Sequence, residues 1–241
     1  MTKRVFLVGT DTNAGKTMVA CSLLASAARN NIAAVPFKPA QTGPPGPESD
    51  SGRLLAASIL STEEDARDLA PHRYRRPIAP GLADDASPFL GQGGPVSEFE
   101  SALGQARWAL ARLEQRHLAQ LSLIEGAGGL LVPMPGGSWL PEWISGLRAR
   151  PLIVARAGLG TINHTLLTIE GLRIRELEPI GFLFTQLLRR DDPSREHNAQ
   201  VIETRSGVPC LGSLPFLGRP ARAPADDGWL VEAFWPLVLG E

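Results

Sequence analysis

The segment that most constrains the fold of this chain lies near its start and reads Gly9-Thr10-Asp11-Thr12-Asn13-Ala14-Gly15-Lys16-Thr17. It follows a short apolar run, Val5–Val8, and precedes an alanine- and leucine-rich stretch that predicts a helix. Gly-Lys-Thr after a strand is the core of a phosphate-binding loop: backbone N–H groups hold phosphate oxygens, the lysine reaches the outer phosphates and the threonine hydroxyl binds Mg²⁺. Gly9 and Gly15 enclose one residue more than the strict pattern, so the loop is a widened variant.

Short apolar runs and helical patterns alternate along the rest of the chain. The predicted strands, besides Val5–Val8, cover residues 32–37, 121–124, 151–157, 180–184 and 208–214. The predicted helices cover residues 16–29, 50–57, 96–120, the stretch from the glycine loop 158–164 to 175, 193–206 and 229–239. This alternation implies right-handed crossovers and the α/β class: a three-layer, doubly wound, mostly parallel sheet with helices on both faces. Residues 1–241 are expected to form one domain.

One long segment interrupts this alternation of strands and helices. Residues 62–95 are rich in charges and prolines and predict an irregular insertion, either a functional lid or a surface excursion. His117, at the end of a helical pattern, is expected to be solvated.

Composition narrows the class of partner. The 241 residues carry a formal net charge of -1, which gives no electrostatic reason to expect nucleic acid or a lipid surface as a partner. No apolar run approaches the roughly 18 residues of a membrane span, and no cleavable leader is evident, so we expect a cytoplasmic protein. Cys21 and Cys210 are expected to be buried thiols of a reducing compartment.

Three further residues are predicted near the phosphate loop. Lys38 follows the strand at 32–37, on the sheet edge where open α/β sheets bind ligands, although it would equally suit a solvated surface. Ser49-Asp50 is typical of the cap of a helix, so Asp50 is either part of that cap or a functional acid. Glu125 ends a strand and precedes glycines, as a second Mg²⁺ position in a phosphate-loop enzyme requires, but it would also satisfy backbone N–H groups of that turn.

Four sequence blocks together resemble the dethiobiotin synthetases, a family of the phosphate-loop superfamily. They are the widened loop at 9–17, Lys-Pro-Ala-Gln-Thr-Gly at 38–43, Glu-Gly-Ala-Gly-Gly at 125–129 and Leu-Gly-Thr-Ile-Asn-His at 159–164. The resemblance implies a P-loop NTPase type of fold. It also implies an ATP-dependent ligase that forms the cyclic urea of dethiobiotin from 7,8-diaminononanoate and CO2, releasing ADP and phosphate.

The resemblance also implies roles for individual residues. Lys16 would bridge the outer phosphates, Lys38 would hold a substrate carbamate against the γ-phosphate, and Thr12 and Thr42 would lie beside these groups. The implied Mg²⁺ ligands are Thr17, Asp50 and Glu125. The implied nucleotide-binding residues are Asp11, Thr12, Asn13, Ala14, Gly15, Lys16, Thr17, Thr185, Gln186, Pro215 and Leu217. The implied substrate-binding residues are Thr42, Gly128, Gly158 and Asn163, with the 158–163 turn serving the neighbouring subunit of a homodimer. Asn163 would also suit the N-cap of its helix.

The chain departs from the family pattern at several positions. Asn13 replaces an acid that many members carry, and Gly81 replaces a common histidine. Thr185 stands where the family has a base-recognising asparagine, and Gln186 where it has an aspartate. A threonine cannot offer adenine the paired donor and acceptor of an amide. The nucleotide-base preference therefore stays open.

Two other classes of protein also have a phosphate loop of this kind. A cobyrinate-type amide-forming synthetase shares the widened loop but carries a downstream glutaminase domain with a nucleophilic cysteine, for which the remaining length has no room. A nucleotide-switched assembly ATPase of the ParA or MinD type usually has a second lysine near the start of the loop, and Thr10-Asp11-Thr12 contains none.

Overall fold

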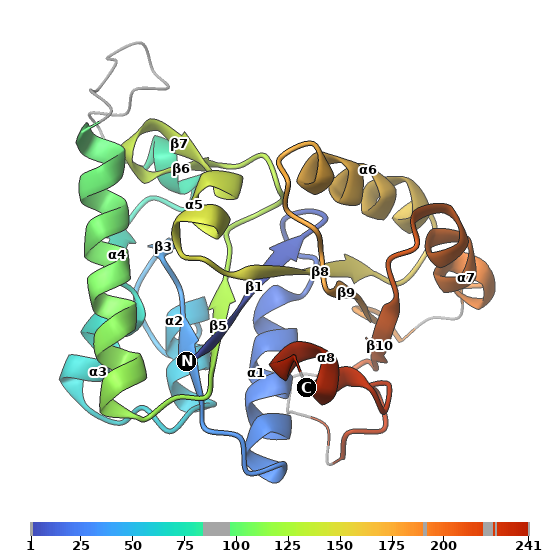
Figure 1. The fold of residues 1–241 in the computed structure, drawn as a ribbon, viewed down its shortest axis with the longest axis horizontal. Coiled ribbons are helices and arrows are strands. Elements are labelled where there is room, and N and C mark those ends of the chain that lie inside the picture. The colour runs from blue at the N-terminus through green and yellow to red at the C-terminus, as the bar shows by residue number, and fades with distance from the viewer. Residues whose placement is uncertain (1, 84–96, 190–191, 219–223, 225, 241) are drawn as a thin grey trace.

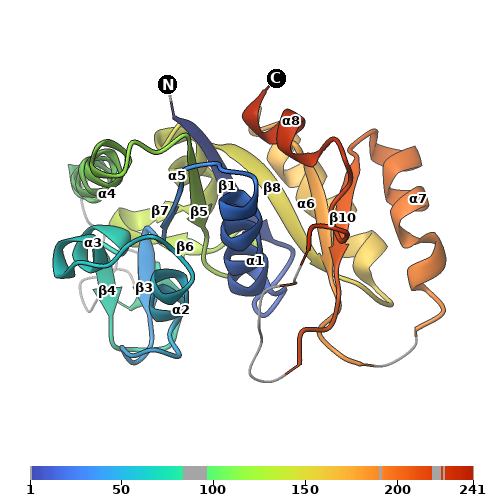
Figure 2. The ribbon, with the colours of Figure 1, turned by 90° about the horizontal axis from the view of Figure 1, so that it is seen from below.

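The fold is built on a six-stranded parallel sheet with the strand order β10-β9-β8-β1-β5-β2 (Figure 1). The computed structural model describes residues 2–83, 97–189, 192–218, 224 and 226–240. The sheet strands are β1 (Lys3–Gly9), β2 (Ala34–Phe37), β5 (Leu121–Glu125), β8 (Arg150–Arg156), β9 (Gly181–Thr185) and β10 (Cys210–Leu214). Figure 2 shows α1 on the near side of the sheet and α6 behind it. The predicted α/β class with helices on both faces is confirmed.

Helices and short strands fill the connections. The helices are α1 (Lys16–Arg29), α2 (Asp50–Ala56), α3 (Glu63–Leu69), α4 (Ser97–Arg116), α5 (Leu140–Gly146), α6 (Thr161–Arg173), α7 (Arg195–Ser206) and α8 (Phe234–Leu239). The small elements are β3 (Ala40–Thr42), β4 (His72–Tyr74), β6 (Pro133–Met134), β7 (Ser138–Trp139) and the 3-10 turns η1 (Pro80–Leu82) and η3 (Pro135–Gly137). None of the helices within the described ranges is long and apolar enough to cross a membrane.

The core explains why the central strands are continuous apolar runs. Val5 to Val8 of β1 are at most 1% exposed, because β1 lies between β5 and β8 and helices cover both faces. The predicted first helix at 16–29 is confirmed residue for residue. β1 and α1 therefore hold the phosphate loop between two well-packed elements.

Several sequence predictions need correction. The segment predicted to be irregular contains α3, β4 and η1, while its residues 84–95 lie outside the described part of the chain. The signal overlooked was a capping box at the start of α3. The Thr62 side chain accepts from the Asp65 N–H, and the Asp65 carboxylate accepts from the Thr62 N–H. The last helix begins at Phe234, later than predicted. Both cysteines are free thiols, only partly buried.

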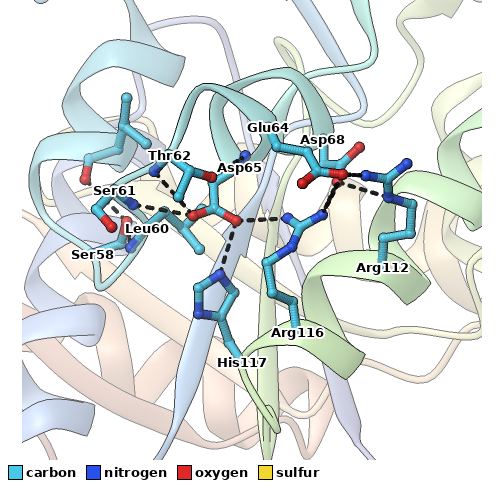
Figure 3. Close-up of polar contacts among 11 residues, drawn as sticks. Ser58, Leu60, Ser61, Thr62, Glu64, Asp65, Asp68, Arg112, Arg116 and His117 are labelled. Carbon is cyan, nitrogen blue, oxygen red and sulfur yellow. Dashed lines mark hydrogen bonds and ion pairs between the residues drawn. The ribbon is translucent and has the colours of Figure 1, made fainter.

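Asp65 also ties α3 to the end of α4 (Figure 3). Its buried carboxylate accepts hydrogen bonds from Arg116 Nη1 at 2.6 Å and His117 Nε2 at 2.9 Å, and from the Ser61 and Thr62 N–H groups. The expectation that His117 is solvated is wrong, because the ring lies against this carboxylate. Burial alone would raise the pKa of Asp65, but these hydrogen bonds outweigh it and hold the pKa below the ordinary 3.8.

We predict that Asp65→Ala lowers the free energy of unfolding at pH 7 by about 3 kcal/mol, because buried donors lose their acceptor. Urea denaturation measures this difference. Glu64→Ala is the matched control, since Glu64 is about half exposed and pairs with Arg112 and Arg116 at the surface. Its effect should stay below about 1 kcal/mol. Equal effects of the two substitutions would contradict the assigned role of Asp65.

The contribution of the Asp65 charge should depend on pH in one direction. Because its folded pKa lies below 3.8, the stabilisation is complete above that value and is lost as the pH falls through it. The difference between the parent and Asp65→Ala should therefore shrink as the pH falls below about 4. A difference that grows as the pH falls below this value would contradict this interpretation.

Candidate active site

The site lies where the carboxyl ends of β1, β5 and β2 meet. These strands are neighbours in register, with Leu7 opposite Glu125 and Phe37 opposite Ile124. The residues that follow β1 and β2 therefore reach the same edge as Glu125. The prediction that Lys38 shares this edge with Lys16 is confirmed, and both side chains are buried rather than solvated.

Lys38 lies between two carboxylates. Its ammonium nitrogen is 2.8 Å from Asp50 Oδ2 and 2.8 Å from Glu125 Oε1. An ammonium has three N–H donors, and these contacts use two of them. Within the described residues no third acceptor bonds to Lys38 Nζ, so one donor remains for a ligand.

Thr17 joins the phosphate loop to the same carboxylates. Its hydroxyl oxygen is 2.9 Å from Asp50 Oδ1 and 2.9 Å from Glu125 Oε1. The helix-cap interpretation of Asp50 is wrong, because Ser49 is the N-cap of α2 and its side chain accepts from the Gly52 N–H. The Asp50 carboxylate thus contacts Lys38 and Thr17 instead of the helix end.

Glu125 is 1% exposed, and its second carboxylate oxygen, Oε2, has no hydrogen-bond partner among the described residues. A buried, unpaired carboxylate oxygen is costly unless a cation or donor completes it. The alternative role, satisfying N–H groups of the glycine turn, finds no support, since no backbone N–H of the described chain bonds to this side chain.

Lys16 contacts backbone carbonyls of two loops. Its Nζ lies 2.6 Å from the Gly128 carbonyl oxygen and 3.3 Å from that of Asp11. Gly9 leaves room for this arrangement, since a Cβ there would lie 2.6 Å from the ammonium and 2.7 Å from each carbonyl oxygen. The glycine turn after β5 is therefore in direct contact with the phosphate loop.

The buried charges shift one another's pKa values. Burial lowers the pKa of Lys16 to about 8. Burial also opposes the charge of Lys38, but the Glu125 and Asp50 carboxylates outweigh it and raise the Lys38 pKa. Burial likewise acts to raise the Asp50 pKa, yet Lys38 and the Thr17 hydrogen bond lower it. For Glu125 burial prevails over Lys38, and its pKa is raised.

The outer part of the phosphate loop is exposed. Asp11, Thr12 and Asn13 all face solvent, and the Thr12 N–H donates to Asp11 Oδ1 at 2.6 Å. Asn13 has φ of 63°, a left-handed conformation that asparagine tolerates better than most side chains. Asn13, which replaces an acid in the family pattern, is therefore also compatible with the backbone of the widened loop.

Thr42 follows a residue that the sequence did not single out, Gln41, whose side chain ties β3 to α2. Its side-chain carbonyl accepts from the Ser51 N–H at 2.9 Å, and its amide nitrogen donates to the Thr42 carbonyl at 2.6 Å. Gln41 thereby links β3 to the first turn of α2, which carries Asp50. A single glutamine in a three-residue strand has no periodic or spacing signal that would have identified it.

Gly158 and Asn163 lie beyond β8, and neither makes a hydrogen bond or ion pair with the Lys38 cluster in the described chain. The Gly158 carbonyl accepts from Asn198 Nδ2 at 3.3 Å. Gly160 is the N-cap of α6, so the helix-cap interpretation of Asn163 is wrong; its side chain faces solvent in the first turn. The exposed Asn163 side chain is accessible to another molecule.

The predicted base-binding residues lie at the ends of β9 and β10. Thr185 is 1% exposed and donates its hydroxyl proton to the Ala14 carbonyl at 2.7 Å. Gln186 is half-buried, Pro215 is exposed and Leu217 is half-buried. The Gln186 N–H donates to the Leu214 carbonyl, which keeps the two strand ends together.

Comparison with known proteins agrees with these features. The family described as "AAA domain" matches residues 3–221. An ATP-dependent dethiobiotin synthetase BioD from Anaeromyxobacter sp. (strain Fw109-5) is 40% identical over 87% of this chain and 88% of its own length. Proteins of the same name from Bacillus velezensis and Bacillus subtilis (strain 168) are 33% and 31% identical, each over 88% of this chain and over 86% and 87% of their own lengths.

Solved structures support the fold alone. Chloroplast FtsY from Physcomitrella patens aligns with a TM-score of 0.53 at 15% identity, over 99% of this chain and 65% of that protein. The 54 kDa signal recognition particle protein from Aeropyrum pernix K1, in complex with GDP, aligns with a TM-score of 0.52 at 18% identity, over 99% and 46%. Because these relatives are 31–40% identical over more than four fifths of both chains, and the phosphate loop and the buried cluster agree with them, the chain belongs to the dethiobiotin synthetase family.

Proposed function

We propose that this chain is a ligase that closes the cyclic urea of dethiobiotin from 7,8-diaminononanoate and CO2, using ATP. The observation that carries the proposal is the position of Lys38, buried between Asp50 and Glu125 beside the phosphate loop. We further propose that residues 1–241 act as one domain, in a cytoplasmic homodimer. The alternatives are a cobyrinate-type amide-forming synthetase and a nucleotide-switched assembly ATPase of the ParA or MinD type, and the loop lacks the second lysine that is usual in the latter.

Mg²⁺ suits the donors at this site. Hard oxygen ligands are what this cation prefers, and Thr17, Asp50 and Glu125 bring a hydroxyl and two carboxylates together. The unpaired Oε2 of Glu125 supports the fit, since a cation would complete it. When bound, Mg²⁺ would neutralise negative charge on the phosphates.

The reaction proceeds in three steps. One amine of the substrate attacks CO2, forming a C–N bond and, after losing a proton, a carbamate. A carbamate oxygen then attacks the γ-phosphorus, and the bond to ADP breaks. The second amine finally attacks the carbonyl carbon of the mixed anhydride, loses a proton and expels phosphate, which closes the ring.

The side chains of the site hold these groups in place and neutralise their charge. The remaining N–H donor of Lys38 holds the carbamate, whose negative charge the buried ammonium offsets. Lys16 exchanges the Gly128 and Asp11 carbonyls for the outer phosphate oxygens. Thr12 and Thr42 supply hydroxyls on the two sides of the carbamate. The remaining loop residues, Asp11, Asn13, Ala14, Gly15 and Thr17, surround the phosphates, and Gln186, Pro215 and Leu217 surround the base.

The exposed surface around α6 supports a shared substrate site. Among the residues that the structure describes, Gly158 and Asn163 form no hydrogen bond or ion pair with the Lys38 cluster, and Leu159 and Leu167 nearby are 90% and 58% exposed. These two leucines would be covered if α6 lay against a second subunit, which would bury their apolar surface. In the proposed homodimer the 158–163 turn of one subunit binds the substrate carboxylate in the site of the other subunit. Gly128 lines the substrate site of its own subunit.

The reaction itself tests the proposal. Purified protein with Mg²⁺, bicarbonate, 7,8-diaminononanoate and ATP, CTP or GTP should form dethiobiotin, detected by mass spectrometry. Lys38→Ala should lower kcat by about a hundredfold or more while nucleotide still binds, because charge stabilisation of the reacting group is lost. Lys3→Ala, an exposed lysine of β1, is the matched control and should keep parental turnover. No product with any nucleotide would refute the proposal.

Mixing two impaired variants tests the shared site. Lys38→Ala and Asn163→Ala are each expected to turn over slowly at low substrate concentration. Random exchange of subunits makes about half of the dimers mixed, each with one intact site, so the mixture should recover about a quarter of the parental activity. A mixture no more active than the mean of the two variants would show that each chain completes its own site.

A further inference from the structure

Thr185 lies at the end of β9, next to the phosphate loop. Its hydroxyl oxygen is 2.7 Å from the Ala14 carbonyl oxygen and 3.3 Å from that of Ala155. A hydroxyl has one proton to donate, and the shorter contact assigns it to Ala14. The donor of this side chain is therefore committed to the backbone of the loop.

The Thr185 backbone is held on both sides. It pairs with Arg156 of β8 and with Leu214 of β10, and its carbonyl accepts from the Ala157 N–H at 2.9 Å. At 1% exposure the side chain has no route to solvent. The position of the Thr185 hydroxyl is therefore fixed by the sheet.

The contact acts on the turn from which α1 starts. Ala14 is fully buried, and Gly15 has φ of 91°, where α1 begins. A Cβ on Gly15 would lie 3.0 Å from the Thr185 methyl group. Thr185 therefore sets the position of this turn by a hydrogen bond and by van der Waals contact. The N–H groups just after the turn are those that hold phosphates in such loops.

We propose that Thr185 is a positioning residue that holds the Ala14–Gly15 turn in its phosphate-binding form and does not recognise the nucleotide base. The inference rests on the proposed nucleotide binding by this loop. The hydroxyl proton is donated to Ala14, and at 1% exposure the oxygen lone pairs are closed off from an amino group of a base. Its effect on affinity must then reach the nucleotide through the phosphates, which ATP, CTP and GTP share.

The test measures equilibrium binding of the Mg²⁺ complexes of ATP, CTP and GTP by isothermal titration calorimetry. Thr185→Val keeps the shape and removes the hydroxyl, which leaves the Ala14 carbonyl without its donor. It should weaken binding of all three nucleotides about tenfold, by a similar factor for each. Thr185→Ser restores the donor and should stay within about twofold of the parent.

Thr168→Val is the matched control. Thr168 is a buried threonine of α6 whose hydroxyl donates to the His164 carbonyl at 2.8 Å, away from the phosphate loop. It should leave nucleotide affinity unchanged, whatever its effect on the melting temperature. If Thr185→Val does not fold, Thr185→Ala removes the same donor with less bulk and takes its place.

Two results would overturn the inference: a loss of affinity confined to one base, or parental affinity in the variant without the hydroxyl. A parent protein that binds none of the three nucleotides would instead refute the proposed function. The two failures are thus distinguishable in one set of titrations.

Discussion

The buried ion pairs of Lys38 with Asp50 and Glu125 are the interaction on which the rest of the site depends. A buried ammonium is costly without partners, and two carboxylates at 2.8 Å compensate it while leaving one N–H donor unused. The same carboxylates contact Thr17, the last residue of the phosphate loop. One cluster therefore connects the nucleotide end of the site to the end where a carbamate would form.

The widened phosphate loop is supported from two directions. The Gly128 carbonyl contacts Lys16 on one side, and the Thr185 hydroxyl contacts Ala14 on the other. The first contact comes from the turn that follows β5 and the second from the end of β9. The elements on both sides of β1 and β8 therefore support the loop. This arrangement puts fixed backbone dipoles and a buried lysine where phosphate charge would lie.

The sequence predicted the sheet strands and the Lys38 cluster because both leave regular signals. Buried parallel strands are continuous apolar runs, and their functional residues follow directly after them. The sequence did not predict α3, because this helix is short and mostly charged, although Thr62 and Asp65 form a capping box at its start. It missed Gln41, and it could not tell that Thr185 points at Ala14. The Gln41–Ser51 and Thr185–Ala14 contacts join residues 10 and 171 positions apart in the chain and leave no periodic pattern.

The central claim is that the Lys38 ammonium, fixed by two carboxylates, holds a substrate carbamate. Carbon-13 NMR of the protein with ¹³C-bicarbonate and 7,8-diaminononanoate, without nucleotide, measures this directly. The parent should show a diamine-dependent carbamate resonance that Lys38→Met, which keeps the length of the side chain and removes its charge, does not show. A carbamate resonance of equal intensity in the variant would contradict the account.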